Sequence, residues 1–302
     1  MHRGVAGCAA VPRGLQVWKG TVRAVFTRSV HVETDSGFVT LGSLALSPHP
    51  CSILWFDFMP GWVPGQHMHI SAGELRTEGG RAVTLHKMRR YAPSFSCSRT
   101  AGKTAVLGVL RATGDALARI PSQGGFHSVY QQSRSHVLRT NDSRLSETIG
   151  NRSGRMGAML AASMRHRDWN AFRGAADALV GLGEGLTPAG DDFLGGVLAA
   201  MRYHGKSTGS ALFPDTLANE LAGQLTAKTT PFSGFLLRLS ARGLVGLPFS
   251  RWLRAAHRGD VAAALASVRQ AAHIGHSSGL DTLAGMLLSL QILNGEKPWT
   301  DY

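Results

Sequence analysis

The sequence is poor in cysteine and in long apolar runs, and each shortage excludes a class of protein. Its three cysteines, Cys8, Cys51 and Cys97, are odd in number and lack the spacing of metal ligands. This argues against a disulfide framework and favours a reducing compartment. No apolar run approaches the length of a membrane span. Residues 5–8, Val-Ala-Gly-Cys, mimic a lipoprotein cleavage site, but only a few weakly apolar residues precede them. We therefore expect a cytoplasmic protein that does not bind membranes.

Acidic residues are also scarce, with 19 Asp and Glu against 32 Lys and Arg and a formal net charge of +13. The excess lies in residues 1–180, which carry 22 basic and 10 acidic side chains, whereas residues 181–302 carry 10 and 9. There is no polybasic run and no nucleic-acid-binding signature, so we expect no nucleic-acid partner. The excess favours attraction of small anionic substrates or an acidic partner.

Length and patterning predict an α+β protein. A chain of 302 residues with 43% hydrophobic content fits one large or two ordinary domains. Residues 1–95 contain short strand-like runs separated by turns, which predict a small β-barrel or sandwich with aromatic side chains such as Phe26 and Trp62 in its core. Residues 156–302 carry apolar residues at helical spacing, which predict a mainly α-helical domain. Residues 96–155 are expected to form a loop-rich connection.

The stretch GLGEGLTPAGDDFLGG, residues 181–196, is the strongest candidate for function. Its glycines allow positive φ and close approach of a ligand to the backbone. Thr187 is a favourable N-cap, and Pro188 suits the first position of the apolar helix that follows. A glycine loop leading into a helix N-terminus favours an anion. The same residues are equally typical of a well-capped helix with Asp191 and Asp192 in its first turns.

A similar pattern recurs at residues 275–288, GHSSGLDTLAGMLL. In both stretches, Ala or Ser near a helix start is followed by the pattern Gly-x-Asp-x-Leu-x-Gly. One interpretation is two helices whose N-termini converge, so that Asp192 and Asp281 face a common cavity. The ungapped overlay places Gly279 on Gly190, Asp281 on Asp192, Leu283 on Leu194 and Gly285 on Gly196.

These residues carry a family resemblance. The first motif resembles the signature G-x-G-x-G-L-T-P-S/A-x-D-D of a bacterial family long catalogued as a domain of unknown function. One branch of that family is identified as a subunit of oxamate carbamoyltransferase, from anaerobic allantoin breakdown. The second motif resembles the family's closing segment, and residues 229–243 resemble a third segment. The resemblance covers residues 180–297 well and the first hundred only in general character. Glu184 departs from it, since the family usually has Pro there.

The resemblance implies transfer of a carbamoyl group between an oxamate-type acceptor and phosphate, by an assembly of several subunits. The expected partners are therefore a small anionic or carbamoyl substrate and other protein subunits. A ligand with one anionic end and one end rich in N–H donors, such as oxalurate, suits both the loop amides and the aspartates. Bound Mg²⁺ is the alternative, and no other cofactor is expected. Two other functions remain open: a non-catalytic accessory or scaffold subunit, and a magnesium-dependent hydrolase.

The candidate catalytic residues are His276, Asp192 and Asp281. A histidine titrates near neutral pH and suits general acid–base work, although His276 is equally typical of a structural residue at a helix junction. No metal site is expected from the scattered His67, His69 and His86. The residues expected to bind substrate or its anionic group are Gly183, Gly185, Thr187, Gly190, Asp191, Thr230, Ser278 and Gly279. Of these, Thr230 and Ser278 are also typical of helix caps.

Overall fold

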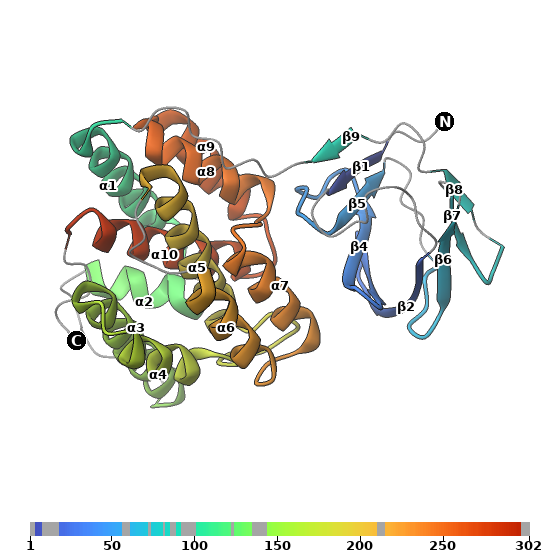
Figure 1. The fold of residues 1–302 in the computed structure, drawn as a ribbon, viewed down its shortest axis with the longest axis horizontal. Coiled ribbons are helices and arrows are strands. Elements are labelled where there is room, and N and C mark those ends of the chain that lie inside the picture. The colour runs from blue at the N-terminus through green and yellow to red at the C-terminus, as the bar shows by residue number, and fades with distance from the viewer. Residues whose placement is uncertain are drawn as a thin grey trace. The chain divides into compact units, whose positions relative to one another are not determined.

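The protein is α+β, as the sequence predicts, and divides into two compact units. The β unit comprises Met1–Ser94 with Leu244–Leu247, and the helical unit comprises Phe95–Gly243 with Pro248–Tyr302 (Figure 1). The computed structural model describes residues 4–7, 18–55, 61–71, 74–80, 82–84, 89–91, 101–121, 124–134, 144–209 and 215–296.

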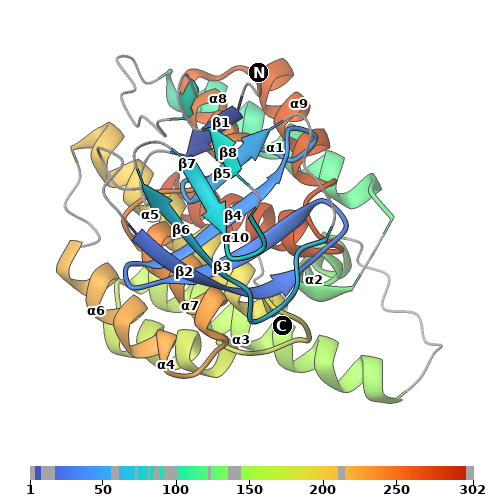
Figure 2. The same cartoon turned by 90° about the vertical axis from the view of Figure 1, so that its right-hand side faces the viewer.

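The β unit is a single curled sheet, resembling half a barrel, with nine strands among the described residues. Its order is β8-β7-β6-β2-β3-β4-β5-β1-β9. Figure 2 shows β2, β3 and β4 side by side in the middle of this sheet. The strands are β1 (Gly4–Gly7), β2 (Trp18–Val25), β3 (Ser29–Thr34), β4 (Gly37–Ser43), β5 (Ser52–Trp55), β6 (His67–Ser71), β7 (Glu74–Thr77), β8 (Ala82–Thr84) and β9 (Arg89–Tyr91).

Alternating side chains of the central strands form the core of this unit. Val30 and Val32 on β3 are fully buried, as is Leu41 on β4. Trp62 joins this core as expected, but Phe26 does not, since it is 48% exposed. Phe26 lies in the turn between β2 and β3, where its ring contacts that of His31 at 5.2 Å between centroids. The prediction that Phe26 packs in the core is therefore wrong, because a turn residue falls outside the alternation of the strands.

The helical unit contains ten helices among the described residues. None of them combines the length and the apolar character that a membrane span requires. They are α1 (Lys103–Arg119), α2 (Gly125–Arg134), α3 (Arg144–His166), α4 (Trp169–Leu179), α5 (Ala189–Thr208), α6 (Asp215–Thr226), α7 (Pro231–Ala241), α8 (Leu247–Arg258), α9 (Val261–Ala271) and α10 (Ser278–Leu293).

Helices α5 and α10 form the centre of the helical unit. Nearly every residue of α10 is buried, which is typical of a helix that is apolar on all sides. Helix α5 is buried along most of its length. The two helices make the most extensive contact of any pair of elements in the described structure, and Figure 1 shows them crossing with other helices around them. Both predicted motifs therefore begin the helices of the core.

The described part of the connection between the predicted domains contains helices where a loop was expected. The Ser-, Gln- and Gly-rich composition of residues 121–141 predicts a loop, yet α2 occupies part of it. Two contacts account for this helix. Phe126 is buried and stacks on Phe193 of α5 at 4.5 Å between ring centroids. Gln131 donates from Nε2 to the carbonyl of Ile120 at 2.6 Å and so satisfies a free carbonyl at the end of α1. A polar residue thus serves helix packing here.

Candidate functional site

Glycines allow α5 and α10 to cross in backbone contact. A Cβ added at Gly196 would lie 2.0 Å from the carbonyl oxygen of Thr282, and one added at Gly285 would lie 2.1 Å from that of Phe193. Atoms do not approach so closely, so both positions require glycine. The two contacts are reciprocal, because Thr282 and Phe193 are themselves equivalent in the overlay of the two motifs. The predicted close approach of the two helices is confirmed.

The two motifs also pack in the same way against the helices that precede them. A Cβ at Gly190 would lie 2.0 Å from the carbonyl oxygen of Leu179, the last residue of α4. A Cβ at Gly279 would lie 1.9 Å from that of Ala271, the last residue of α9. The chain therefore contains a structural repeat, α4–loop–α5 and α9–loop–α10. In this repeat, Gly190 and Gly279 let each helix pack closely against the helix before it. Both glycines belong to the helices α5 and α10 and not to the loops.

The first loop, between α4 and α5, has backbone N–H groups that donate to no acceptor in the described structure. Its glycines Gly181, Gly183 and Gly185 have φ of 72°, 119° and 91°, in the left-handed region that favours glycine. Within the described structure, the N–H groups of residues 183–187 donate to no protein acceptor. The same holds for residues 275–277 of the second loop. Free amides beside two helix N-termini are the donors that an oxyanion requires.

The side chain of Thr187 joins the two loops and does not cap α5. Its hydroxyl lies 3.1 Å from that of Ser278, the first residue of α10. The N-cap of α5 is Pro188, which makes no side-chain cap, so the predicted capping role of Thr187 is wrong. The reason is that the hydroxyl of Thr187 turns to that of Ser278 and to the carboxyl group of Asp192, where burial raises the pKa and both hydroxyls oppose that rise. A tertiary contact has replaced the local one.

Thr230 supports the first loop from α7. It is the N-cap of that helix, as expected, and accepts the N–H of Ser233 at 3.1 Å. Its own hydroxyl donates to the carbonyl of Leu186 at 2.6 Å. Both interactions of Thr230 are thus with the protein, which assigns it a supporting role.

Asp191 is fully engaged by donors of the protein. Its carboxylate accepts the N–H of Gly181 at 2.7 Å and the hydroxyl of Ser233 at 2.6 Å, together with the hydroxyl of Thr229. The side chain is 2% exposed. Asp191 therefore ties the first loop to the N-terminus of α7, and its charge is compensated there.

Asp281 binds the N-terminus of α2. It is fully buried, and its Oδ1 accepts the N–H of His127 at 2.9 Å. A Cβ at Gly125 would lie 2.5 Å from either carboxyl oxygen, so glycine is needed for this approach. Burial raises the pKa of Asp281 to about 6, opposed by hydrogen bonds from His127, Ser277 and Phe126. Its Oδ2 has no partner among the described residues.

Asp192 lies between the two loops and is the least compensated of the three aspartates. Burial raises its pKa well above the ordinary value, and the charges of Asp281 and Asp191 add to this effect. Hydroxyls of Ser278 and Thr187 oppose it. Its Oδ2 is inaccessible to solvent and has no partner within the described residues. Burial therefore disfavours the ionised form of this carboxyl group.

His276 makes no described contact with the aspartates that would define its role. It is exposed on the second loop, beside Gly275 with φ of 61°. No hydrogen bond in the described structure joins its side chain to an aspartate. In the described ranges, no three His, Cys, Asp or Glu side chains lie close enough together to hold a metal ion.

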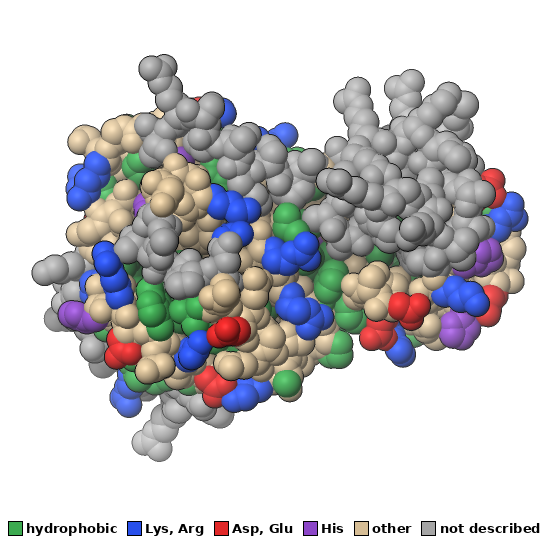
Figure 3. Space-filling view, viewed as in Figure 1, with side chains coloured by type: hydrophobic (Ala, Val, Ile, Leu, Met, Phe, Trp, Pro, Cys, Tyr) green, Lys and Arg blue, Asp and Glu red, His purple; other side chains and the backbone are tan. Residues whose placement is uncertain are grey.

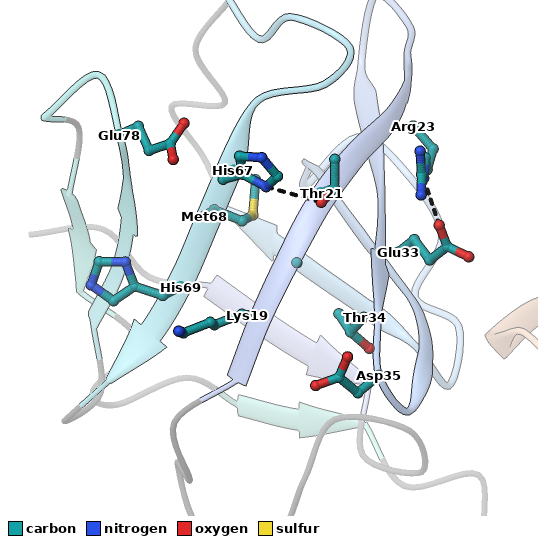
Figure 4. Close-up of a pocket in the computed structure, with 11 residues that line it drawn as sticks. Lys19, Thr21, Arg23, Glu33, Thr34, Asp35, His67, Met68, His69 and Glu78 are labelled. Carbon is teal, nitrogen blue, oxygen red and sulfur yellow. Dashed lines mark hydrogen bonds and ion pairs between the residues drawn. The ribbon is translucent and has the colours of Figure 1, made fainter.

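A hollow of about 630 Å³ lies on the β unit, and the residues that line it belong to neither motif. Polar side chains of β2, β3 and β6 line it, as Figure 4 shows. His67 lies against Thr21, with 3.1 Å between Nδ1 and Oγ1, and His69 is exposed further along β6. His86 lies outside the described residues. Arg23 and Glu33, which both line the hollow, form an ion pair.

Surface charge is dispersed on the face shown in Figure 3. The described Lys and Arg side chains lie at separate places over the helical unit and are interleaved with Asp and Glu side chains. This face therefore shows no single basic patch of the kind that binds nucleic acid.

Sequence reasoning missed the contribution of α2 to the site, and at the start of α7 it named Thr230 alone. Gly125 and His127 position Asp281, and Thr229 and Ser233 hold Asp191. The Gly-Gly pair at residues 124–125, placed just before an apolar residue, is the available signal for a helix start in close contact with another group. The pairing of distant helix N-termini with particular aspartates has no signal in one sequence.

Comparison with known proteins supports the resemblance. The family model described as oxamate carbamoyltransferase subunit AllH matches residues 179–290. The match runs from the last residue of α4 into α10 and includes both glycine loops. No solved structure matches the chain.

Proposed function

We propose that this chain is a subunit of a carbamoyltransferase of the oxamate type, and that its two loops bind the substrate of the transfer. The family match supports the first statement, because it covers the residues that build both loops. The N–H groups of residues 183–187, which donate to no acceptor in the described structure, support the second, since free backbone amides beside a helix N-terminus favour an oxyanion. The other subunits of the transferase are the expected partners.

The proposed reaction transfers a carbamoyl group between oxamate and phosphate. In the direction of oxalurate breakdown, the bond from the carbamoyl carbon to the oxamate nitrogen breaks. A bond from that carbon to a phosphate oxygen forms, and the oxamate nitrogen gains the proton that the phosphate loses. Both substrates carry an anionic group that suits the loop amides. Asp192 and the hydroxyls of Thr187 and Ser278 are the polar side chains at the junction of the two loops.

An accessory role is the second candidate, and a specific observation favours it. Asp191 and Asp281 are occupied by the N-termini of α7 and α2, and the conspicuous glycines Gly190, Gly196 and Gly285 all serve backbone packing. These roles need no ligand. A magnesium-dependent hydrolase has less support, because the described carboxylates of the motifs do not converge in a group of three.

Ligand-induced thermal stabilisation tests the proposal. The midpoint of unfolding of the full chain, with any subunits that co-purify, is measured with oxamate, oxalurate, carbamoyl phosphate, phosphate and Mg²⁺ in turn. A ligand that binds only the folded state raises the midpoint. In Gly183→Ala we expect the stabilisation by carbamoyl compounds or oxamate to be lost. Gly183 has φ of 119°, and an added Cβ would lie 2.7 Å from the amide nitrogen of Ala189, so the loop must change shape.

Gly209→Ala is the matched control. Gly209 also has positive φ, 68°, but it ends α5 at the opposite end from the loop, and an added Cβ meets no atom within 4 Å. This variant should lose stability through backbone strain, by about 1 kcal/mol, and keep the full response to ligand. Equal ligand responses in the two variants, or no response of the wild-type protein to any carbamoyl compound or oxamate, would favour the accessory role.

A further inference from the structure

The start of the first loop is joined to α7 through the carboxylate of Asp191. The N–H of Gly181 donates to its Oδ1 at 2.7 Å. Its Oδ2 accepts the hydroxyl of Ser233 at 2.6 Å and also the hydroxyl of Thr229. The side chain of Ser233 is buried, so water does not take the place of this acceptor. The start of the loop is therefore held by hydroxyl groups at the N-terminus of α7.

The end of the first loop is joined to the same place. The hydroxyl of Thr230, the N-cap of α7, donates to the carbonyl of Leu186 at 2.6 Å and accepts the N–H of Ser233 at 3.1 Å. The first turn of α7 thus holds the loop at residue 181 and again at residue 186. Between these two positions, residues 183–185 are exposed, and their N–H groups donate to no acceptor in the described structure.

The glycines of the loop make this support important. Gly183 and Gly185 have φ of 119° and 91°, and glycine loses more conformational freedom on folding than any other residue. A loop that is released at one end populates its binding conformation only part of the time, which lowers the apparent affinity for a ligand by the same fraction. A loop that is held in one conformation before the ligand arrives avoids this loss.

We propose that Thr229, Thr230 and Ser233 (the α7 hydroxyls) are positioning residues, which fix both ends of the first loop so that the N–H groups of residues 183–185 are arranged before a ligand binds. This rests on the proposed function, since it takes the first loop to bind the substrate. The ligand class is a small oxyanion, a carboxylate or a phosphate. Each of the α7 hydroxyls donates to an acceptor of the protein, so they act through the loop and not by contact with the ligand.

A purely structural role of the α7 hydroxyls has a different consequence. Hydroxyls that only stabilise α7 would lower the stability of the protein when they are removed, and the molecules that stay folded would bind ligand as before. Removal of a positioning hydroxyl lowers the affinity of the folded molecules as well. Thr230 has both roles, because it also caps α7. Thr230→Val is therefore compared with Thr230→Ser, which keeps a hydroxyl for both hydrogen bonds.

The test is binding of oxamate and of carbamoyl phosphate to the full chain, with any subunits that co-purify, by isothermal titration calorimetry. Wild type, Ser233→Ala, Thr230→Val and Thr230→Ser are compared at a temperature at which each is folded, as unfolding midpoints without ligand show. Ser163→Ala is the matched control, since it also removes a buried hydroxyl, which donates to the carbonyl of Leu160 at 2.7 Å within α3. If Ser233→Ala does not fold, Thr229→Val replaces it, because Thr229 is less buried and donates to the same carboxylate oxygen.

We expect Ser233→Ala and Thr230→Val each to lose at least about tenfold in affinity, as expected when about one residue of the loop must be ordered by the ligand. Thr230→Ser should stay within about threefold of wild type, and Ser163→Ala should bind as wild type does. Wild-type affinity in folded Ser233→Ala or in folded Thr230→Val, or an equal loss in Ser163→Ala, would overturn the proposal and leave the proposed function standing. Wild-type protein that binds neither ligand would contradict both.

Discussion

Three aspartates near the starts of α5 and α10 have three different environments. Asp191 accepts hydrogen bonds from a backbone N–H and two hydroxyls, and Asp281 binds the N-terminus of a neighbouring helix. Asp192 alone combines hydroxyl donors from both loops with an unpartnered oxygen. Asp191 and Asp281 therefore hold the N-termini of α7 and α2, and Asp192 lies at the junction of the two loops.

The raised pKa of Asp281 predicts a pH-dependent stability. An acid with a pKa of about 6 when folded and near 4 when unfolded favours the folded state in its protonated form. This contribution is fully present below about pH 4 and is lost as the pH rises through about 6, a change of at most about 3 kcal/mol. Asp281→Asn removes the titration. From about pH 4 to about pH 7.5, the variant should gain stability relative to wild type by up to this amount.

Urea unfolding of wild type and Asp281→Asn at the two pH values measures this difference. Asp177→Asn is the control, because Asp177 is an exposed carboxylate that pairs with Lys228. A stability difference between wild type and Asp281→Asn that stays constant with pH would show that Asp281 titrates normally.

Predictions for single residues succeeded where the interaction is local and failed where it is not. Thr230 caps α7 through its own neighbour Ser233, and the sequence predicts this. Thr187 has the same local features, yet its hydroxyl lies against Ser278 of another helix. His276 is exposed on its loop, and its acid–base role stays a prediction.

At the scale of elements, the crossing of α5 and α10 determines the site. It brings two glycine loops together, and it depends on the absence of a side chain at Gly196 and Gly285. The sequence predicts this pair of helices because both motifs keep glycine at the same spacing from an aspartate. The sequence does not predict α2, because the Ser and Gln residues of this helix are typical of loops. Contacts with α1 and α5 support the helix instead.

Gly285→Ala tests the crossing. The added methyl group would meet the carbonyl of Phe193 at 2.1 Å, so α5 and α10 must separate, at a cost of about 3 kcal/mol or more in the free energy of unfolding. Gly223→Ala is the control in an exposed part of α6, where an added Cβ meets no atom within 4 Å. It should stabilise by up to about 1 kcal/mol through helix propensity. Denaturant titration compares the two, and equal effects would show that α5 and α10 do not cross in backbone contact.

At the scale of the whole molecule, the sequence predicts the α+β class and the succession of a β-rich and a helical part. The hairpin of β3 and β4 and the bounds of α10 follow from local patterns. No local pattern predicts that residues Leu244–Leu247 return to the β unit. There the N–H of Leu247 donates to the carbonyl of Pro48 at 2.7 Å, and the hydroxyl of Tyr91 donates to that of Val245. Neither contact has a sequence pattern.

The most direct test of the account is carbamoyl phosphate formation from oxalurate and phosphate by the complex that co-purifies with this chain. Complexes that contain wild type, Gly183→Ala or Gly209→Ala are compared after their subunit content is matched. If the first loop binds the transferred substrate, Gly183→Ala should lower kcat/KM by at least about a hundredfold, and Gly209→Ala should leave it unchanged. A complex with Gly183→Ala that turns over at the wild-type rate would contradict a substrate site at these loops.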